Sequence, residues 1–456
     1  MAQLAQAWLV TPNEIVGALF ILGVVTVGAT SLAYTALALV RRRRRRPPPA
    51  RRGDDPGDPL PVTVLIAAYN EEAVIEATLR SLVLSSYPVR EFLVVDDGST
   101  DATAEIVERL RITLDPRIRL LRQPNGRKPA ALNRGMRAAV GDYVITVDAD
   151  TQADPDLVGN LVRHFEADVY GTIAAVAGVV RVGNRATNLL TRWQGLEYLS
   201  LIGIERAAHD LLGAIAIVPG ACAAWRRAAV LQAGGFSDAT LAEDNDLTLS
   251  LHRLGWRITQ DDEARASTEA PEDLDSLLRQ RVRWTFGSVQ ATTKHRDMLL
   301  RPRYGWLGML VLPTGVLSLV LPLLTIPFVA VMSVLVLTQQ GPFALGGYYL
   351  LFTAVQGLVA SAAVRLLRER ADHLLVVPVY RFVYEPLRAY LLYRSAYLAA
   401  RGIPVGWNKL ARTGALNQVP LARSAGTSAG RSVESSTGAA PWPVVAGVPP
   451  SGGTTP

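Results

Sequence analysis

The chain has 456 residues, of which 49% are hydrophobic, and its formal net charge is +7. This length exceeds that of one ordinary domain, and the positive mean hydropathy indicates that part of the apolar material lies in lipid. A single cysteine excludes an intramolecular disulfide framework and a cysteine-rich zinc site. Subtracting the eight arginines of residues 41–52 from +7 leaves −1, so the charge does not indicate nucleic-acid binding.

The first predicted element is an apolar run over residues 14–40, with one acidic residue at its start and no charge after it. About 20 apolar residues span a bilayer core, so residues 1–40 are predicted to hold an N-terminal transmembrane helix. A basic, proline-rich linker follows over residues 41–60. The positive-inside rule places the N-terminus outside and this linker in the cytoplasm, where its arginines are expected to contact anionic lipid. A cleaved signal peptide would need basic residues before the apolar run.

Residues 61–300 alternate between strand and helix signals and are predicted to form a cytoplasmic domain. The expected strands cover residues 62–69, 92–95, 118–122 and 143–147, and the expected helices begin at Asn70, begin near Asp101 and cover 129–140. Asn70 is a good helix cap. Repeated strand–helix–strand units predict an α/β fold with a Rossmann-like, doubly wound parallel sheet. No G-x-G-x-x-G follows these strands and no Walker loop is present, which argues against a standard dinucleotide binder or a P-loop enzyme.

The most informative stretch is the strand pattern over residues 144–147, which runs straight into Asp148 and Asp150. Ligands of open α/β sheets collect at the carboxyl ends of such strands. Two carboxylates at that edge suit Mg²⁺ or Mn²⁺, which take oxygen ligands and accept a diphosphate as co-ligand. The alternative interpretation of the triplet is a solvated Asp-Ala-Asp turn.

Four other segments accompany these two aspartates. They are Tyr69-Asn70-Glu71 and Asp96-Asp97-Gly98 at strand ends, Ala242-Glu243-Asp244 before an apolar helical run, and a segment with Gln280, Arg283 and Trp284. The last three residues lie within about one helical turn. Taken singly, the third segment could be only a capped helix start, and the fourth only an amphipathic helix at a membrane surface.

Residues 301–400 are predicted to form membrane-spanning and interfacial helices. Two apolar blocks cover residues 305–338 and 343–364, whereas residues 373–400 also carry Arg381, Glu385, Arg388 and Arg394. Charges are expensive in hydrocarbon unless they face protein or water, so the third block is predicted to be interfacial. The alternatives are a span with buried polar residues, a re-entrant segment, or a block 305–338 that crosses the membrane twice. Residues 401–415 then lie in the cytoplasm, as a loop expected near the active site. Residues 416–456 are rich in Gly, Ser, Ala and Pro and are expected to be a disordered tail.

In this order, the five segments resemble those of the processive inverting glycosyltransferases of family 2, which include cellulose, hyaluronan and poly-N-acetylglucosamine synthases. The resemblance covers residues 60–300, and the flanking apolar segments match that architecture. Residues 219–227 and 407–414 look most like bacterial poly-β-1,6-N-acetylglucosamine synthases. The resemblance implies a nucleotide-sugar-binding domain of the GT-A type inserted between transmembrane helices. It also implies a multi-pass protein of the bacterial inner membrane with its catalytic domain in the cytoplasm.

For the donor, the resemblance implies roles at the strand ends. Asp96 and Asp97 look like the loop that receives uracil and ribose, Tyr69 and Glu71 would frame the base, and Lys128 matches a lysine near the nucleotide; a solvated surface lysine is the alternative. Asp148 would bind the nucleotide, and Asp148 with Asp150 would hold Mg²⁺ or Mn²⁺.

For the acceptor, Asp244 matches the catalytic base of a Thr-Glu-Asp motif, with Glu243 beside it and Ala242 in place of the threonine. Trp284 would stack on the acceptor sugar, and Gln280 and Arg283 would hold the acceptor end or the diphosphate.

The implied function is sugar transfer from a UDP-sugar, with UDP-N-acetylglucosamine favoured, to a growing β-linked polysaccharide. The expected partners are the UDP-sugar donor, a glycan acceptor, membrane lipid and, because the spans are few, an accessory export subunit; nucleic acid is not expected. One alternative is a non-processive enzyme that adds one sugar to a lipid acceptor. Others are a nucleotide-sugar-binding assembly component and a membrane receptor, but neither accounts for the order of the carboxylates.

Overall fold

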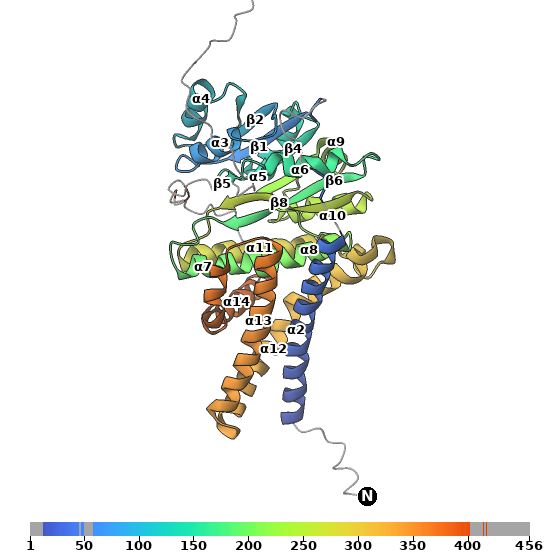
Figure 1. The fold of residues 1–456 in the computed structure, drawn as a ribbon, viewed down its shortest axis with the longest axis vertical. Coiled ribbons are helices and arrows are strands. Elements are labelled where there is room, and N and C mark those ends of the chain that lie inside the picture. The colour runs from blue at the N-terminus through green and yellow to red at the C-terminus, as the bar shows by residue number, and fades with distance from the viewer. Residues whose placement is uncertain (1–11, 45–46, 50–57, 402–413, 415, 417–456) are drawn as a thin grey trace, which may run out of the picture. The chain divides into compact units, whose positions relative to one another are not determined.

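The computed structural model describes residues 12–44, 47–49, 58–401, 414 and 416, without the side chains of residues 12–27 and of a few residues within later helices (Figure 1). These residues belong to one compact unit, Met1–Leu421. Most of the loop predicted over residues 401–415, and all of the predicted tail except Leu416, lie outside the described residues.

The strands and helices follow one another in the alternating order expected for residues 61–300. The strands are β1 (Val62–Ala68), β2 (Glu91–Asp96), β3 (Ile118–Arg122), β4 (Tyr143–Val147), β5 (Thr151–Ala153), β6 (Ile173–Val182), β7 (Cys222–Arg226) and β8 (Arg257–Thr268). The helices among them are α3 (Ile75–Val83), α4 (Thr103–Thr113), α5 (Arg127–Ala138), α6 (Leu157–Glu166), α7 (Leu189–Glu197), α8 (Ile204–Leu211), α9 (Arg227–Gln232), α10 (Glu243–Arg253) and α11 (Leu274–Lys294). Outside this region lie α2 (Pro12–Arg44), α12 (Leu312–Gln339), α13 (Pro342–Leu366) and α14 (Val377–Ala400).

The eight strands form one sheet in the order β3-β2-β1-β4-β7-β6-β8-β5. Strands β1 to β4 are parallel, as predicted. The prediction of a wholly parallel sheet is wrong, because β7 is antiparallel to both β4 and β6, and β5 is antiparallel to β8. Although β5 follows β4 after only three residues, it lies at the edge of the sheet beside β8 and is not a neighbour of β4.

The direction of β7 matters for the site. Cys222, its first residue, pairs with Val147, the last residue of β4. The chain therefore enters β7 at the edge of the sheet where Asp148 begins, and the residues just before β7 are brought to that edge.

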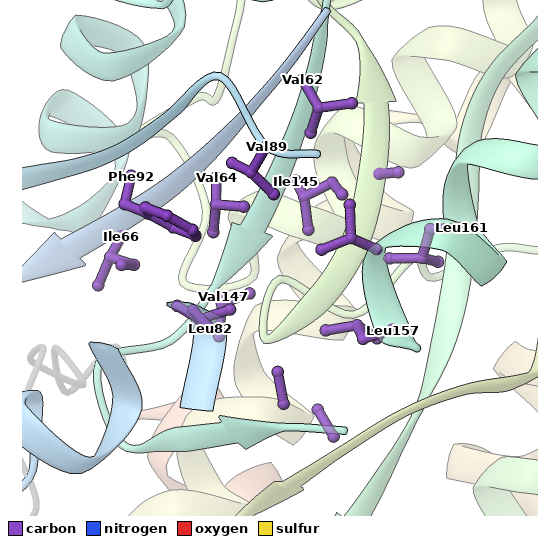
Figure 2. Close-up of a cluster of buried hydrophobic side chains, with 14 of the residues drawn as sticks. Val62, Val64, Ile66, Leu82, Val89, Phe92, Ile145, Val147, Leu157 and Leu161 are labelled. Carbon is purple, nitrogen blue, oxygen red and sulfur yellow. The ribbon is translucent and has the colours of Figure 1, made fainter. Parts of the chain in front are cut away.

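An apolar layer covers each face of the sheet because side chains alternate along the buried strands. On β1, Val62, Val64 and Ile66 pack with helices α3 and α6 in one layer, as Figure 2 shows for part of that cluster. Leu65 packs on the opposite face, in a second layer that includes Leu132 of α5.

Asn70 does not cap a helix, contrary to the prediction. Its backbone is left-handed, with φ +54°, and its Oδ1 accepts a hydrogen bond of 2.7 Å from Thr100 N. Helix α3 begins only at Ile75. Asn tolerates this conformation better than most residues, so Asn70 ties the end of β1 to the loop after β2.

The apolar blocks of the sequence are helical. The run at 14–40 lies within α2, and two helical stretches among the described residues, Leu307–Gln339 and Pro342–Leu366, are long and apolar enough to cross a membrane. Figure 1 shows α7, α8 and α11 between the sheet and these long helices.

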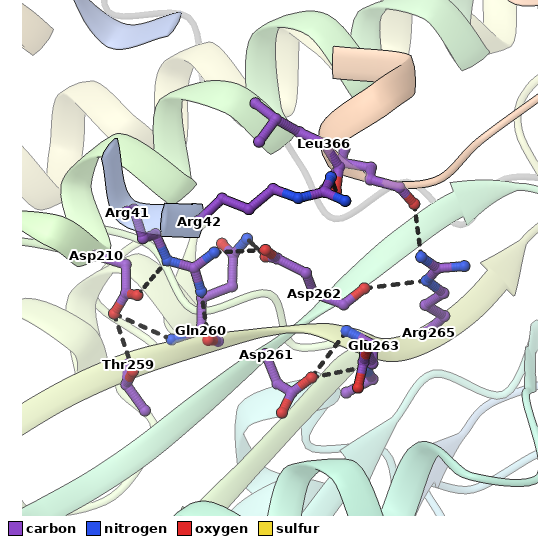
Figure 3. Close-up of polar contacts among 12 residues, drawn as sticks. Arg41, Arg42, Asp210, Thr259, Gln260, Asp261, Asp262, Glu263, Arg265 and Leu366 are labelled. Carbon is purple, nitrogen blue, oxygen red and sulfur yellow. Dashed lines mark hydrogen bonds and ion pairs between the residues drawn. The ribbon is translucent and has the colours of Figure 1, made fainter. Parts of the chain in front are cut away.

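The end of α2 is fastened to this layer by Arg41 (Figure 3). The guanidinium pairs with Asp210 of α8 and Asp262 of β8, both at 2.5 Å, and donates to the carbonyl of Gln260 at 2.7 Å. Arg42 donates to the carbonyls of Arg365 and Leu366 at the end of α13. Arg41 is thus buried against protein, where the sequence predicted lipid contact, because carboxylates of the folded domain supply its partners.

Candidate active site

Four predicted residues meet at the carboxyl edge of the parallel strands. Lys128 Nζ lies 2.5 Å from Asp148 Oδ1 and 3.6 Å from Glu243 Oε1. Gly220 N donates a 3.2 Å hydrogen bond to Asp244 Oδ2. A Cβ added to Gly220 would lie 3.6 Å from Lys128 Nζ and 3.9 Å from Asp244 Oδ2. The structure thus brings together side chains that are up to 116 residues apart in the sequence, from Lys128 to Asp244.

Each of these groups is placed by a different element. Lys128 lies in the first turn of α5, and Asp148 follows β4 directly. Gly220 lies at this edge because β7 runs antiparallel to β4. Glu243 and Asp244 open α10, where the helix dipole favours negative charge. Lys128 is therefore paired with carboxylates of this cluster and is not the solvated surface lysine of the alternative interpretation; its role at the nucleotide stays a prediction.

The electrostatics of the cluster favour a base at Asp244. Burial raises the pKa of Asp244, although the Lys128 ammonium and hydrogen bonds from the backbone N–H groups of Gly220 and Asn245 oppose this. Burial likewise raises the pKa of Glu243, with the Lys128 ammonium again opposing it. Burial disfavours the Lys128 ammonium, but the charges of Asp148 and Glu243 outweigh it and raise its pKa. A carboxylate with a raised pKa takes up a proton more readily than an ordinary one.

Asp96 and Asp97 are buried in the loop after β2. Asp97 Oδ1 accepts hydrogen bonds from Gln123 Nε2 at 2.6 Å and from Gly126 N at 2.9 Å, and Asp96 Oδ1 accepts one from Ser99 N at 3.0 Å. These hydrogen bonds hold the loop after β2, the predicted donor loop, in its conformation.

Gly98 is required in this loop. Its φ is +80°, and an added Cβ would lie 2.8 Å from Asn125 N. The loop after β2 and the start of α5 can approach each other this closely only because residue 98 has no side chain.

The other two predicted donor residues flank Asn70. Tyr69, at the end of β1, is 37% exposed, which leaves part of its ring open to a ligand. Glu71 N donates to Thr103 Oγ1 at 2.7 Å. The segment 69–71 is thus held against the loop that follows β2.

Asp148 and Asp150 have the donor chemistry for a hard cation. The Asp148 side chain is 32% exposed. Asp150 is buried and accepts hydrogen bonds from the hydroxyls of Thr151, at 3.2 Å, and Thr268, at 3.4 Å. In the part of the chain that the structure describes, no group of three or more His, Cys, Asp or Glu could hold a metal ion. The two carboxylates fit Mg²⁺ or Mn²⁺ only if further oxygens, such as those of a diphosphate, complete the coordination.

Two of the described residues that follow α14, Gly414 and Leu416, pack against the strands near this aspartate. Gly414 N donates a 3.2 Å hydrogen bond to Glu269 Oε2, and Glu269 follows Thr268, the residue that contacts Asp150. Leu416 is buried, at a position that a Cβ on Gly183 would overlap. The prediction that residues 401–415 approach the active site otherwise falls on undescribed residues and stays a prediction.

Helix α11 carries Gln280, Arg283 and Trp284 and packs against the start of α10. Gly287 lies one turn after Trp284, and a Cβ there would be 2.8 Å from Ala242 N. Gln290 Oε1 accepts a 3.0 Å hydrogen bond from Leu241 N. The helix that carries the predicted acceptor residues therefore touches the chain two residues before Asp244.

Sequence reasoning missed two residues that organise this helix, Arg281 and Glu197. Arg281 Nη2 lies 2.6 Å from Glu197 Oε2, and both side chains are buried. No local pattern could have indicated the pair, because 84 residues separate its members.

It also missed that Asp246, in the same acidic segment as Asp244, has a structural role. Asp246 is buried between Lys294 Nζ, at 2.6 Å, and His295 Nε2, at 2.7 Å. It joins α10 to the end of α11 and so fixes the packing that positions Asp244.

One part of the chain matches a known protein family. Residues 63–233 match the family described as Glycosyl transferase family 2. This part of the chain is therefore similar to a family 2 glycosyltransferase domain. The predicted resemblance to this family is confirmed, and the α/β fold of the GT-A type with it; insertion of the domain between transmembrane helices stays a prediction.

Several similar proteins are synthases of one polysaccharide. The chain is 34% identical over 226 residues to the poly-beta-1,6-N-acetyl-D-glucosamine synthase of Staphylococcus aureus, which covers 50% of this chain and 54% of that protein. The corresponding synthase of Staphylococcus epidermidis is 31% identical over the same length. The match thus spans about half the length of these curated relatives.

A solved structure shares the fold of this chain. The mannosyltransferase PcManGT from Pyrobaculum calidifontis, in complex with GDP-Man and Mn²⁺, aligns with a TM-score of 0.57 and 23% identity over 81% of this chain and 99% of its own.

Proposed function

We propose that the protein is a membrane-bound inverting glycosyltransferase that transfers N-acetylglucosamine from UDP-N-acetylglucosamine to a growing β-linked polysaccharide. The observation that carries this proposal is the half-buried Asp244, held by Gly220 N beside Lys128 and the strand-end Asp148. The names of the Staphylococcus synthases support the sugar and the polymeric product. The two apolar helices support the membrane location.

In the proposed reaction, Asp244 accepts the proton of an acceptor hydroxyl while that oxygen attacks the anomeric carbon of the donor. The new carbon–oxygen bond forms as the bond from the anomeric carbon to the diphosphate oxygen breaks, and the electron pair leaves with UDP. Attack from the opposite side inverts the anomeric centre. The raised pKa of Asp244 suits this role, because a base works best when its pKa approaches the working pH.

The other residues of the cluster allow the ionised Asp244 and the diphosphate of the donor, both negatively charged, to occupy one site. Lys128 offsets the carboxylates of Asp148 and Glu243, which would otherwise repel a diphosphate and keep Asp244 protonated. Asp148 and Asp150 would hold Mg²⁺ or Mn²⁺, which when bound neutralises charge on the leaving diphosphate. Tyr69, Glu71, Asp96 and Asp97 are proposed to line the nucleoside end of the donor site.

The remaining partners belong to the same proposal. The glycan acceptor would lie along α11, with Trp284 stacked on a sugar ring and Gln280 and Arg283 at the acceptor end or the diphosphate. Membrane lipid would surround α2, α12 and α13 in the bacterial inner membrane, and an accessory subunit would assist export.

The test is product formation by the full-length protein, purified in detergent, with Mg²⁺ or Mn²⁺ and each common UDP-sugar, and with GDP-mannose as a comparison. The expected product is a long polymer made from UDP-N-acetylglucosamine, cleaved by a β-1,6-specific hydrolase. Asp244→Asn should abolish turnover and keep UDP binding, because it removes the base and preserves its shape. UDP release with only a one-sugar lipid product would instead establish the non-processive alternative, and donor binding without any turnover would establish the binding component.

A further inference from the structure

Arg281 lies inside the predicted acceptor segment and contacts two of its predicted residues. Its side chain is only 8% exposed. Arg281 Nη1 donates a 2.9 Å hydrogen bond to Gln280 Oε1, and its Cζ lies 4.2 Å from the centroid of the Trp284 ring. This distance is well within the range of a cation–π interaction, which strengthens when the cation is shielded from water.

The contact with Gln280 fixes the orientation of its amide. A guanidinium only donates hydrogen bonds, so the amide group that faces Arg281 must be the carbonyl oxygen. Gln280 Nε2 is thereby left as a donor on the other side of the amide. An amide donor beside an aromatic ring is the kind of pair that binds a sugar, with a hydroxyl on the donor and a ring face on the aromatic group.

Glu197, at the end of α7, holds Arg281 in place. Its Oε2 accepts hydrogen bonds from Arg281 Nη2 at 2.6 Å and from the Tyr384 hydroxyl at 2.8 Å. Its Oε1 lies 3.7 Å from Arg388 Nε. Burial favours the neutral carboxyl, but Arg281 and Arg388 outweigh it and hold the pKa of Glu197 below its usual range. Glu197 is therefore charged at neutral pH.

The network joins three helices that the sequence does not place together. Glu197 belongs to α7, Arg281 to α11, and Tyr384 and Arg388 to α14. An apolar cluster packs around it, with members on α7, α11, α13 and α14: Trp193, Leu196, Leu277, Ala360, Val376, Val377, Tyr380 and Tyr384. A buried ion pair contributes little net stability compared with apolar residues of the same volume, so geometric specificity is a physically reasonable role for it.

We infer that Glu197 and Arg281 are a positioning pair, which fixes the Gln280 amide and the Trp284 ring for binding the acceptor glycan. This inference rests on the proposed function. Neither residue of the pair touches the reacting atoms; Glu197 acts through Arg281, and Arg281 acts through Gln280 and Trp284. Because Glu197 is also held from α14, the acceptor site depends on a helix that begins 83 residues after the end of α11.

The test compares acceptor and donor affinities in the full-length protein. Glu197→Gln removes the charge of the anchor and keeps its shape, and Arg281→Lys keeps the charge but loses the fork. Each should raise the KM for an N-acetylglucosamine oligosaccharide roughly tenfold and shorten the polymer, because small misplacements of binding groups have large effects. UDP affinity should stay within twofold of the wild type.

A double variant covers the case in which a single change leaves an unpaired buried charge and prevents folding. Glu197→Leu combined with Arg281→Met replaces the pair with apolar residues, which fold at least as readily in comparable cases. It should bind UDP normally and show the same loss of oligosaccharide affinity. Asp261→Asn is the matched control, since it breaks another buried ion pair, with Arg163, on the sheet domain. Its oligosaccharide KM should be unchanged.

Oligosaccharide binding measured by calorimetry in the presence of UDP separates this inference from the proposed function. If the wild type binds the oligosaccharide but forms no polymer, the proposed function fails and the comparison of variants still tests the pair. Folded Glu197→Gln and double variants with wild-type oligosaccharide affinity and polymer length would overturn the inference. So would a wild type that binds no oligosaccharide, because there would be no acceptor site to position.

Discussion

Gly287→Ala tests whether the packing of α11 against the start of α10 sets the position of Asp244. A methyl group at this position would lie 2.8 Å from Ala242 N, 2.9 Å from Ala242 Cβ and 2.9 Å from the carbonyl carbon of Leu241. Two of these three atoms are backbone atoms, so the clash is not relieved by turning a side chain. The start of α10 has to move away from α11, or α11 away from α10.

The magnitude follows from two opposing effects. Replacing a helical glycine with alanine normally stabilises a helix by about 1 kcal/mol, whereas overpacking a close contact costs about 1–3 kcal/mol. Because the contact is with backbone, we take the upper part of the second range and expect a net loss of about 1–2 kcal/mol. For a domain of this size, that lowers the melting temperature by roughly 2–8 °C.

The functional effect should exceed the stability effect. Asp244 lies two residues after Ala242, and a displacement of 1 Å in a reacting group can reduce the rate by about 100-fold. Polymer formation from UDP-N-acetylglucosamine should therefore fall in kcat, while UDP affinity, measured by calorimetry, stays close to that of the wild type.

Gly357→Ala is the matched control. Gly357 is also inside a helix, α13, and an added Cβ there would meet nothing within 4 Å. It should keep kcat, and its melting temperature should equal or slightly exceed that of the wild type, because the gain in helix propensity meets no opposing clash. A Gly287→Ala protein that is as stable and as active as Gly357→Ala would refute the reasoning, because the start of α10 would then not depend on contact with α11.

Three further predictions concern charge. Lys128→Met should move the acid limb of the pH–rate profile to higher pH. Loss of the ammonium raises the pKa of Asp244, so the base stays protonated over a wider range of pH. An acid limb at the wild-type pH would show that Lys128 does not act on Asp244. Removing divalent cations with a chelator should abolish polymer formation, and added Mg²⁺ or Mn²⁺ should restore it. In the Asp148→Asn variant, the concentration of cation that restores half of the activity should be higher than in the wild type. An unchanged half-saturating concentration would argue against Asp148 as a ligand. Arg41→Ala should destabilise the protein by about 3 kcal/mol, measured by thermal unfolding, because it leaves the buried Asp210 without its 2.5 Å contact to the guanidinium. An unchanged melting temperature would mean that this ion pair does not hold α2 against α8.

The parts of the fold that the sequence predicts well are those encoded by neighbouring residues. Strands β3 and β4 have the predicted bounds, because each is a short β-prone run enclosed by polar residues. The same local pattern predicts that Asp148 lies at the carboxyl edge of the sheet, directly after β4. The directions of β5 and β7 could not be predicted in this way, since each depends on a partner strand that is distant in the sequence.

The site divides in the same way. Asp148, Asp244 and Lys128 each lie in a recognisable local segment, and the structure confirms that they approach one another. Nothing local identifies Glu197, because its charge is explained only by Arg281 and by α14, which are distant in sequence. Asn70 shows the opposite error: it has the side chain of a helix cap, but its Oδ1 finds the backbone of the neighbouring loop instead.

Arg388, one of the charged residues within 373–400, faces protein. Arg388 approaches Glu197 at 3.7 Å, and Tyr384 donates to the same carboxylate. A cation in contact with a buried carboxylate avoids the cost of lipid exposure, so Arg388 does not argue against a position of α14 close to the membrane. It does argue against a span surrounded by lipid, because α14 must keep this face against α7 and α11. The interfacial helix stays a prediction, and the contact with Glu197 gives it a physical reason: an α14 at the interface would keep Arg388 and Tyr384 on the carboxylate that is proposed to position the acceptor segment.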